Sequence, residues 1–138
     1  MIRKLALTLA MVFVAGSLFG NTTLFSKYED LRKALVDQSL VNTRSASASL
    51  ATAAKAAGQA DIASRAIEVN RAADLARARV AFSALSESMI RMRNAAKGAR
   101  PAVYYCSMEK KSWLQAKGTV GNPYVDKSMT SCGELNAD

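Results

Sequence analysis

Two cysteines and two methionines near the C-terminus are the residues of this sequence with the most distinctive chemistry. Cys106 is followed two positions later by Met108, and Cys132 is preceded three positions earlier by Met129. If the chain folds back so that the two cysteines meet, two thiolates and two thioethers gather in one place. Soft sulfur ligands suit copper(I), whereas thioether is unusual for zinc. The pattern predicts a copper(I) site formed by Cys106, Met108, Met129 and Cys132.

The same cysteines allow a second interpretation, a structural disulfide between Cys106 and Cys132. Paired cysteines in exported proteins first suggest such a bond, and the N-terminus of this chain indicates export, as described below. In the loop-entropy model a crosslink over this span stabilises by roughly 3–4 kcal/mol. The metal site and the disulfide exclude each other at any instant, because a disulfide sulfur is a poor metal ligand. A redox-active pair is the third alternative.

Histidine is absent from the sequence, and its absence limits the possible chemistry. It removes the commonest general base, the commonest zinc ligand and any haem attachment through C-x-x-C-H. No Ser/His/Asp or Cys/His arrangement can form, and no glycine-rich phosphate loop is present. The cysteines also lack the C-x-x-C spacing of disulfide oxidoreductases. We therefore expect a protein that is not an enzyme.

The first twenty residues have the pattern of a secretory signal peptide. Arg3 and Lys4 form a basic tip, and an apolar run of 15 residues, 5–19, follows. That run is short for a bilayer span, which needs roughly 20 residues, and it fits the apolar core of a signal sequence. We predict a signal peptide over residues 1–20, with an uncleaved membrane anchor as the alternative. Both interpretations place the rest of the chain beyond a membrane.

The chain is basic, with 19 Lys and Arg residues against 11 Asp and Glu residues and a net charge of +8. The basic side chains are spread along the expected helices, which is typical of solvated helix faces. Nucleic-acid binding would require a focused patch or a known binding fold, and neither is visible. The helical basic residues are Arg65, Arg71, Arg77, Arg79, Arg91, Arg93, Lys97 and Arg100.

Hydrophobic periodicity predicts helices over residues 24–97. Leu24, Tyr28, Leu31 and Leu35 follow one another at steps of four, three and four, which places them on one helix face. A break with Asp37 or Ser39 as a cap precedes an alanine- and serine-rich segment, and Gly58 ends that segment. A third segment begins near Asp61 and has an interruption near Asn70. Its apolar stripe is Leu75, Ala78, Phe82, Leu85, Met89 and Met92.

After Gly98 and Pro101 the composition changes to aromatic, β-branched and turn-forming residues. We interpret residues 101–135 as an irregular cap packed on the helices through Tyr104, Tyr105, Trp113 and Tyr124. The predicted fold is all-α: an antiparallel three- or four-helix bundle with an irregular C-terminal cap closed by a disulfide or a metal ion. Residues 21–138 form a single domain in this prediction.

The C-terminal motifs resemble those of an uncharacterised bacterial exported domain. The succession "YYCSM", "SWLQ", "NPYVDKSM" and "SCGEL" is similar to that domain's tail, and "RVAFSALSESMIRM" is similar to its preceding helix. The similarity spans roughly residues 24–135. Ser107 replaces the usual proline, the insert before the tryptophan is shortened to "EKK", and the helices lack the histidines of many relatives. The matching motif residues are Cys106, Met108, Trp113, Asn122, Pro123, Tyr124, Met129, Cys132 and Gly133.

The resemblance implies an exported helical domain of the periplasm or cell envelope. Such domains also occur at the C-terminus of periplasmic adaptor subunits of heavy-metal efflux pumps, including the copper/silver type. The function expected from it is that of an accessory protein in heavy-metal efflux or homeostasis that binds copper(I). The alternative is a non-catalytic interaction module of an efflux-type assembly, whose cap is fixed by the disulfide. The expected partner is an efflux adaptor or another envelope protein, with membrane contact only through an uncleaved signal segment.

Overall fold

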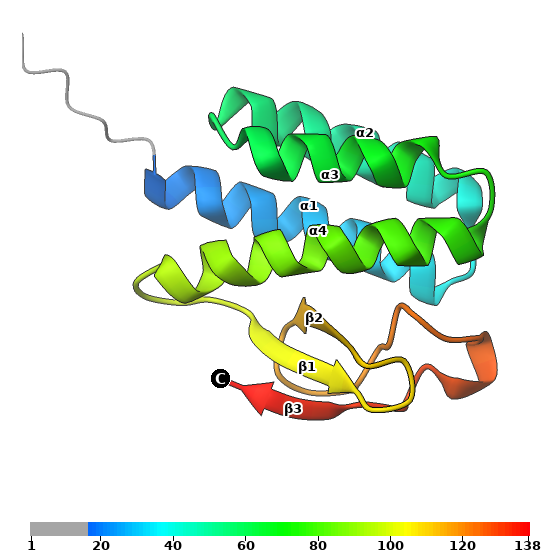
Figure 1. Cartoon of the computed structure of the whole chain (residues 1–138). Coiled ribbons are helices and arrows are strands. Elements are labelled where there is room, and N and C mark those ends of the chain that lie inside the picture. Colours follow the sequence, from blue (N-terminus) through cyan, green and yellow to red (C-terminus); the bar gives the residue numbers. More distant parts are fainter. Residues whose placement is uncertain (1–16) are drawn as a thin grey trace, which may run out of the picture.

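The computed structural model describes residues 17–138, so residues 1–16 of the predicted signal segment lie outside the described residues. Four helices come first and three short strands follow them (Figure 1). Within residues 17–138 no helix combines the length and the hydropathy that a bilayer crossing needs. The elements are α1 (Ser17–Val36), α2 (Leu40–Ala56), α3 (Ala60–Arg71), α4 (Leu75–Ala95), β1 (Ala102–Cys106), β2 (Lys111–Gln115), the 3₁₀ helix η1 (Lys127–Met129) and β3 (Glu134–Ala137).

The helices form an antiparallel bundle in which consecutive helices are joined by tight turns (Figure 1). Ser39 caps α2 by accepting a hydrogen bond from the backbone N–H of Asn42, and Asp74 caps α4 in the same way through Arg77 N–H. Both side chains satisfy N–H groups that have no partner within the helix. Gly58 has a φ of +71° in the α2–α3 turn, a conformation that glycine adopts without steric cost.

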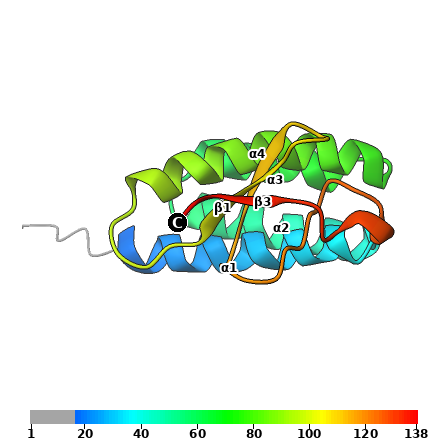
Figure 2. The same cartoon turned by 90° about the horizontal axis from the view of Figure 1, so that it is seen from below.

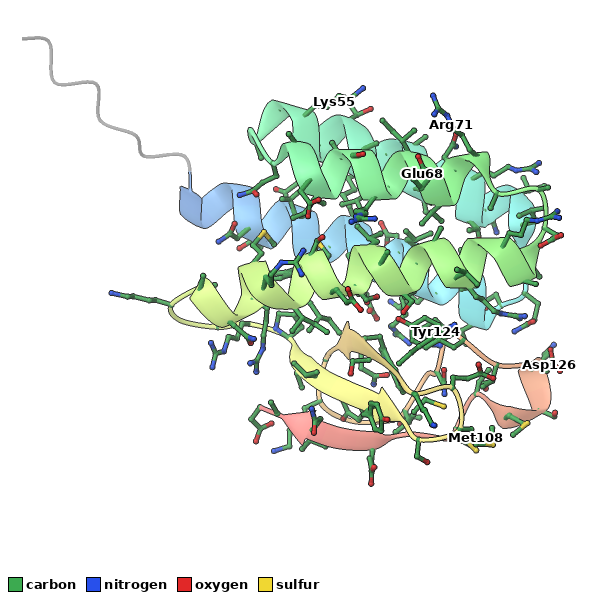
Figure 3. The ribbon with its side chains drawn as sticks, viewed as in Figure 1. Lys55, Glu68, Arg71, Met108, Tyr124 and Asp126 are labelled. Atoms are coloured by element: carbon green, nitrogen blue, oxygen red, sulfur yellow. The ribbon has the colours of Figure 1, made fainter. Side chains whose placement is uncertain are left out.

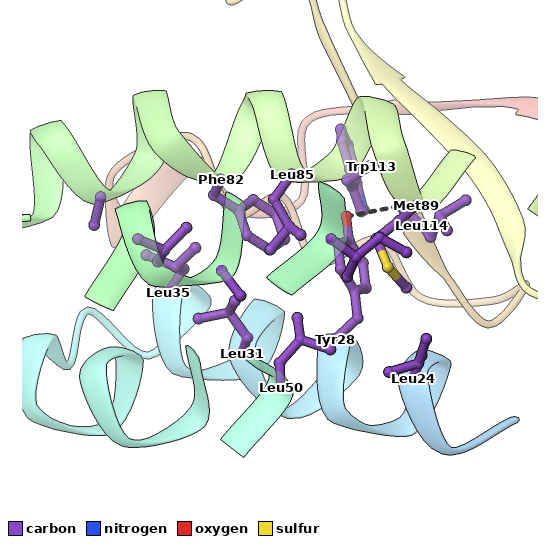
Figure 4. Packing of buried hydrophobic residues seen from close by; sticks show 14 of the residues in the cluster. Leu24, Tyr28, Leu31, Leu35, Leu50, Phe82, Leu85, Met89, Trp113 and Leu114 are labelled. Atoms are coloured by element: carbon purple, nitrogen blue, oxygen red, sulfur yellow. Dashed lines mark hydrogen bonds between the residues drawn. The ribbon is translucent and has the colours of Figure 1, made fainter. Parts of the chain in front are cut away.

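One hydrophobic core joins the helices to the C-terminal segment. Tyr28 and Phe82 stack with ring centroids 4.9 Å apart, and Leu31, Leu50 and Leu85 are fully buried around them (Figure 4). The α2 helix contributes small residues, and its buried Thr43 and Ser47 hydroxyls donate to carbonyls of the same helix turn. Because these hydroxyls are satisfied locally, α2 packs closely without leaving polar groups unpaired.

The all-α prediction is wrong, because the C-terminal segment forms a three-stranded antiparallel sheet with the order β2-β1-β3. β1 pairs with β2 over five residues, from Ala102 opposite Gln115 to Cys106 opposite Lys111. The segments "AVYYC" and "KSWLQ" contain the aromatic and β-branched residues that pleated strands favour. Five-residue strands joined by a four-residue turn therefore replace the irregular cap that we expected.

The sheet lies across the side of the bundle formed by α1 and α4 (Figure 2). In Figure 1, β2 is the strand nearest to α4 and β3 is the outermost strand. β3 pairs only with β1, and a register irregularity between Val103 and Tyr104 interrupts their pairing. The sheet therefore has one edge turned toward the helices and one edge turned toward solvent.

Candidate functional site

Trp113 of β2 is the centre of the C-terminal segment. Its side chain is fully buried, stacks with Tyr104 at 5.8 Å between ring centroids and meets the edge of Tyr124 at 6.1 Å. The indole Nε1–H donates to Gln115 Oε1 at 2.9 Å. The aromatic residues that the sequence places in the C-terminal segment thus form a core between the sheet and the helices.

Asn122 holds the long connection between β2 and β3 in its bent path. Its side-chain N–H donates to Cys132 O at 2.8 Å, and its Oδ1 accepts from Tyr124 N–H at 2.9 Å. Its backbone N–H donates to Thr130 O at 2.7 Å. The two bonds to Cys132 and Thr130 tie the start of the connection to its end, so a fully buried amide fixes the position of Cys132.

Gly133 brings β3 against Trp113. A Cβ at this position would lie 2.5 Å from Trp113 Cη2, and the residue has a φ of +154°. Gly133→Ala is therefore expected to lower the free energy of unfolding by about 1–3 kcal/mol, through overpacking against the indole and an unfavourable backbone conformation. Denaturant unfolding of the purified protein measures this change.

Gly118→Ala is the matched control for that substitution. Gly118 also has a positive φ, +147°, but a Cβ there would meet nothing within 4 Å. Gly118→Ala therefore carries the cost of an unfavourable backbone conformation, about 1 kcal/mol, without the cost of a clash with a neighbouring side chain. Equal destabilisation by the two substitutions would contradict the close contact between Gly133 and Trp113.

The structure brings three of the four predicted sulfur ligands around one hollow. Cys106 at the end of β1, Met108 in the β1–β2 turn and Cys132 before β3 line a cavity of about 250 Å³. Cys106 is buried and Cys132 is exposed, and Met108 is 55 % exposed. Met129 lies elsewhere: it is half-buried and packs against the hydrophobic core. We call the cavity the sulfur-lined hollow.

The predicted disulfide between Cys106 and Cys132 is wrong, because both are free thiols. The register of the sheet gives the physical reason. Tyr105 pairs with Glu134, and continuing that register places Cys106 opposite Gly133 rather than opposite Cys132. Successive residues of an extended chain point to opposite sides, so a shift of one residue separates a buried thiol from an exposed one.

The predicted copper(I) site is also wrong. Within residues 17–138 no three His, Cys, Asp or Glu side chains gather in a way that could hold a metal ion. Met129 ends the 3₁₀ helix η1 and contributes to the core instead of to the hollow. The set of two thiols and two thioethers therefore does not assemble as the spacing predicted. Besides its three sulfur residues the hollow is lined by Tyr105, Ser107, Gly133 and Glu134.

A buried hydroxyl network, not foreseen from the sequence, closes the inner edge of the sheet. Tyr28 of α1 and Ser86 of α4 are 2.7 Å apart through their hydroxyl oxygens, and the hydroxyl oxygens of Tyr124 and Ser86 are 3.1 Å apart. Leu114 N–H donates to Tyr28 OH at 3.2 Å, and Tyr124 OH donates to Ser112 O at 2.6 Å. On the edge of β2 that faces the helices, the N–H of Leu114 and the C=O of Ser112 are therefore hydrogen-bonded to the hydroxyl groups of Tyr28 and Tyr124.

Burial in this network raises the pKa of both phenols. For Tyr28 burial dominates, and the hydrogen bonds with Ser86 and Leu114 oppose it in part. For Tyr124 burial again comes first, followed by repulsion from Tyr28. A phenolate would lose its hydration, and the positive charge of Arg32 near Tyr28 offsets only part of that cost, so the neutral form is favoured. The sequence signal was the position of Tyr28 within an otherwise leucine stripe, which marks a buried aromatic with a polar tip.

Three arginines from the helices also hold the C-terminal segment. Arg32 Nη1 donates to Gly121 O at 2.6 Å, Arg79 Nη2 donates to Val125 O at 3.3 Å, and Arg93 Nε donates to Pro101 O at 2.9 Å. Burial lowers the pKa of Arg93, and repulsion from Arg100 adds to this. Arg93 is 3 % exposed, so the interpretation of the basic residues as solvated helix faces fails for Arg93.

Two large apolar side chains of the C-terminal segment are exposed: Met108, which lines the sulfur-lined hollow, and Leu135, which follows the lining residue Glu134 along β3. Met108 and Leu135 are two of the few large hydrophobic side chains that are exposed in the described part of the chain, at 55 % and 43 %. Met108 lies at the sheet's outer side, away from the helices (Figure 3). We call Met108, Leu135 and the hollow between Tyr105 and Cys132 the sheet patch.

No family model, curated protein or solved structure matches the chain. The resemblance of its C-terminal motifs to the exported bacterial domain therefore stays a prediction. The geometry of the sheet patch and the chemistry of its residues carry the functional argument.

Proposed function

We propose that this protein is an exported, non-catalytic interaction module of the cell envelope that binds its partner through the sheet patch. The absence of histidine, the signal-like N-terminus and the resemblance of the C-terminal motifs support this proposal. The observation that carries it is the exposure of Met108 at a preformed hollow, with the exposed Leu135 next in sequence to the lining residue Glu134. Apolar groups around a small pocket are the usual anchor of a protein interface.

The hydrogen bonds within and around the sheet support a binding function for the sheet patch. Tyr28 and Tyr124 satisfy the inner edge of β2, and the bends at Asn122 and Gly133 place Cys132 at the hollow. The exposure of Met108 and Leu135 leaves apolar surface in water, which forgoes hydrophobic stabilisation. Apolar groups left exposed with polar groups around them are typical of interaction sites.

Side-chain contacts, rather than addition of a partner strand, are the favoured mode of binding. β3 has only four residues, Glu134–Ala137, and its pairing with β1 is irregular. Short, irregular and charged edges resist strand addition. The hollow instead accepts one aromatic or aliphatic side chain, for which the sulfur atoms of Met108, Cys106 and Cys132 are favourable neighbours.

The proposed partner is another envelope protein, with a periplasmic adaptor subunit of a heavy-metal efflux pump as the first candidate. This identification rests on the resemblance of the C-terminal motifs. In this proposal the protein contributes binding and placement within the assembly. Localisation to the periplasm or cell envelope belongs to the same proposal.

A photo-crosslinking amino acid at Met108 tests the proposed interface in cells. We expect a crosslinked envelope protein, identified by mass spectrometry, and no such product when the same group replaces Val41. Val41 on α2 is 76 % exposed and is the matched apolar control. No product at Met108, or the same product at both positions, would end the proposal.

Met108→Glu gives the quantitative version of the test with the purified partner. Placing a carboxylate beside the hollow is expected to weaken binding by about 10-fold or more, which is the size of a single hot-spot contact. Titration calorimetry measures the affinity, and thermal unfolding should remain close to that of the unmodified protein because Met108 is exposed. Unchanged affinity would show that the partner binds elsewhere.

A further inference from the structure

The α3–α4 hairpin contains a second surface with the properties of a binding site. A groove of about 720 Å³ runs between the two helices. Its floor is apolar and made of small residues, and its rim carries charged side chains. We call it the alanine groove; it is lined by Arg65, Glu68, Arg71, Ala72, Ala73, Ala76, Arg77, Val80, Ala81 and Ala84.

The floor of the alanine groove lies mostly outside the hydrophobic core, to which it contributes Ala72 and the partly buried Ala81. On α4 the core positions are Ala78, Phe82, Leu85 and Met89, all fully buried, and Val80 points away from them with 64 % of its surface exposed. Val80 and the methyl groups of the neighbouring alanines thus form an apolar trough open to solvent. Small side chains keep the trough accessible to the backbone of an approaching element.

The rim of the groove is positively charged. Arg65 and Arg77 make only exposed ion pairs, 3.8 Å from Asp61 and 3.2 Å from Asp74, and such pairs are worth at most about 1 kcal/mol. The Arg71 side chain is exposed and makes no hydrogen bond or ion pair within residues 17–138. Glu68 is the single acidic residue of the lining, so the groove presents excess positive charge beside apolar surface.

We infer that the alanine groove binds an amphipathic helix of a partner protein whose acidic side chains flank a stripe of small apolar residues. A straight trough between two helices fits a third helix, because alanine contacts permit short interaxial distances. The acidic side chains would meet Arg65, Arg71 and Arg77, and guanidinium groups bind carboxylates in a two-pronged geometry. This inference does not depend on the proposed function of the sheet patch.

The same observations disfavour the other occupants of such a groove. A second copy of the chain would place one arginine-rich rim against another, which is repulsive. A planar anionic bilayer could meet the arginines, but the groove offers only Val80 as an exposed large apolar side chain that could insert into it. Charge and shape together therefore favour an acidic helix.

The position of the groove allows it to act at the same time as the sheet patch. Figure 3 shows Glu68 and Arg71 on the side of the molecule away from Met108. The helices α1 and α4 lie between α3 and the sheet (Figure 1). A partner helix in the groove and a partner side chain in the hollow would not collide, so the module could bridge two proteins.

A synthetic helical peptide tests the inference. It has a stripe of alanine and leucine flanked by glutamates, and a companion peptide has lysine at every glutamate position. Fluorescence anisotropy with the full chain should show binding of the glutamate peptide, weakening as salt rises from about 50 to about 300 mM because the contacts are exposed. The lysine peptide should not bind.

Two variants assign the binding to the groove. The double substitution Arg71→Glu and Arg77→Glu should weaken binding of the glutamate peptide by about 10-fold or more. Ala76→Leu, which fills the floor and leaves every charge in place, should do the same. The double substitution Lys97→Glu and Lys127→Glu makes an equal charge change at exposed sites outside the groove and should change the affinity by less than about 2-fold.

Three outcomes would overturn the inference. The first is equal binding of the two peptides, and the second is full binding by Ala76→Leu or by the arginine variant. The third is arginine-dependent binding to phosphatidylglycerol vesicles without binding of the glutamate peptide, which would make the groove a lipid-facing surface. Thermal unfolding followed by circular dichroism confirms that each variant is folded. Failure of the sheet-patch experiments leaves these results unaffected.

Discussion

Replacement of Trp113 by alanine is expected to lower the free energy of unfolding by about 3–5 kcal/mol. The indole is fully buried and contacts Tyr104, Tyr124 and the backbone at Gly133, so its removal leaves a cavity where the strands meet the helices. This loss is a large part of the total stability of a typical domain, about 5–15 kcal/mol. Urea unfolding followed by circular dichroism measures it.

Trp113→Phe separates the contribution of packing from that of the indole hydrogen bond. Phenylalanine keeps an aromatic ring beside Tyr104 and removes the Nε1–H that donates to Gln115 Oε1. That oxygen also accepts from Gly121 N–H and stays satisfied, so Trp113→Phe is expected to cost less than half as much as Trp113→Ala. A loss below about 1 kcal/mol for Trp113→Ala would show that the sheet is not held by this contact.

The helices could be predicted from the sequence because the residues that define each helix face and each helix end lie within that helix or next to it. The step pattern of Leu24, Tyr28, Leu31 and Leu35 marks one buried face, and Ser39 and Gly58 mark helix ends through their own side-chain and backbone chemistry. None of these signals depends on a distant residue. The helices could therefore be placed before any contact between them was known.

The sheet could not be predicted in the same way, because β1 and β3 pair across nearly thirty residues of intervening chain. "AVYYC" and "KSWLQ" are each five residues long, too short for periodicity to distinguish a strand from an irregular segment. Pairing of Tyr105 with Glu134 depends on bonds made by Asn122 and on the space at Gly133. Such a register has no local signature in the sequence.

The predicted sulfur site failed for the same reason. Spacing alone gave Met108 and Met129 equal claims as ligands, yet η1 directs Met129 to the core while the β1–β2 turn leaves Met108 exposed. The strand register places Cys106 opposite Gly133, one residue away from Cys132. Sequence identified the residues of the sheet patch, since Cys106, Met108 and Cys132 do line one hollow, but it assigned them the wrong chemistry.

Alkaline pH is expected to destabilise the fold through Tyr28 and Tyr124, whose pKa values are both raised by burial. In the unfolded chain these phenols release their protons near pH 10, while the folded chain still holds them. Stability from the neutral phenols is therefore complete below about pH 10 and is lost as the pH rises above it. The expected slope is about 1.4 kcal/mol per pH unit for each tyrosine, and twice that for the pair.

Substitution of each tyrosine tests whether Tyr28 and Tyr124 cause the alkaline pH dependence of the free energy of unfolding. Tyr28→Phe leaves Leu114 N–H without its acceptor, which costs about 1–3 kcal/mol at neutral pH, but the variant should lose only half of the alkaline slope. Tyr124→Phe should remove the other half, and the double variant should be nearly insensitive between about pH 10 and about pH 12. Urea unfolding at each pH gives the slopes. If Tyr28→Phe keeps the full slope of the unmodified protein, the tyrosines do not hold their protons in the network, and β2 is held to the helices by packing alone.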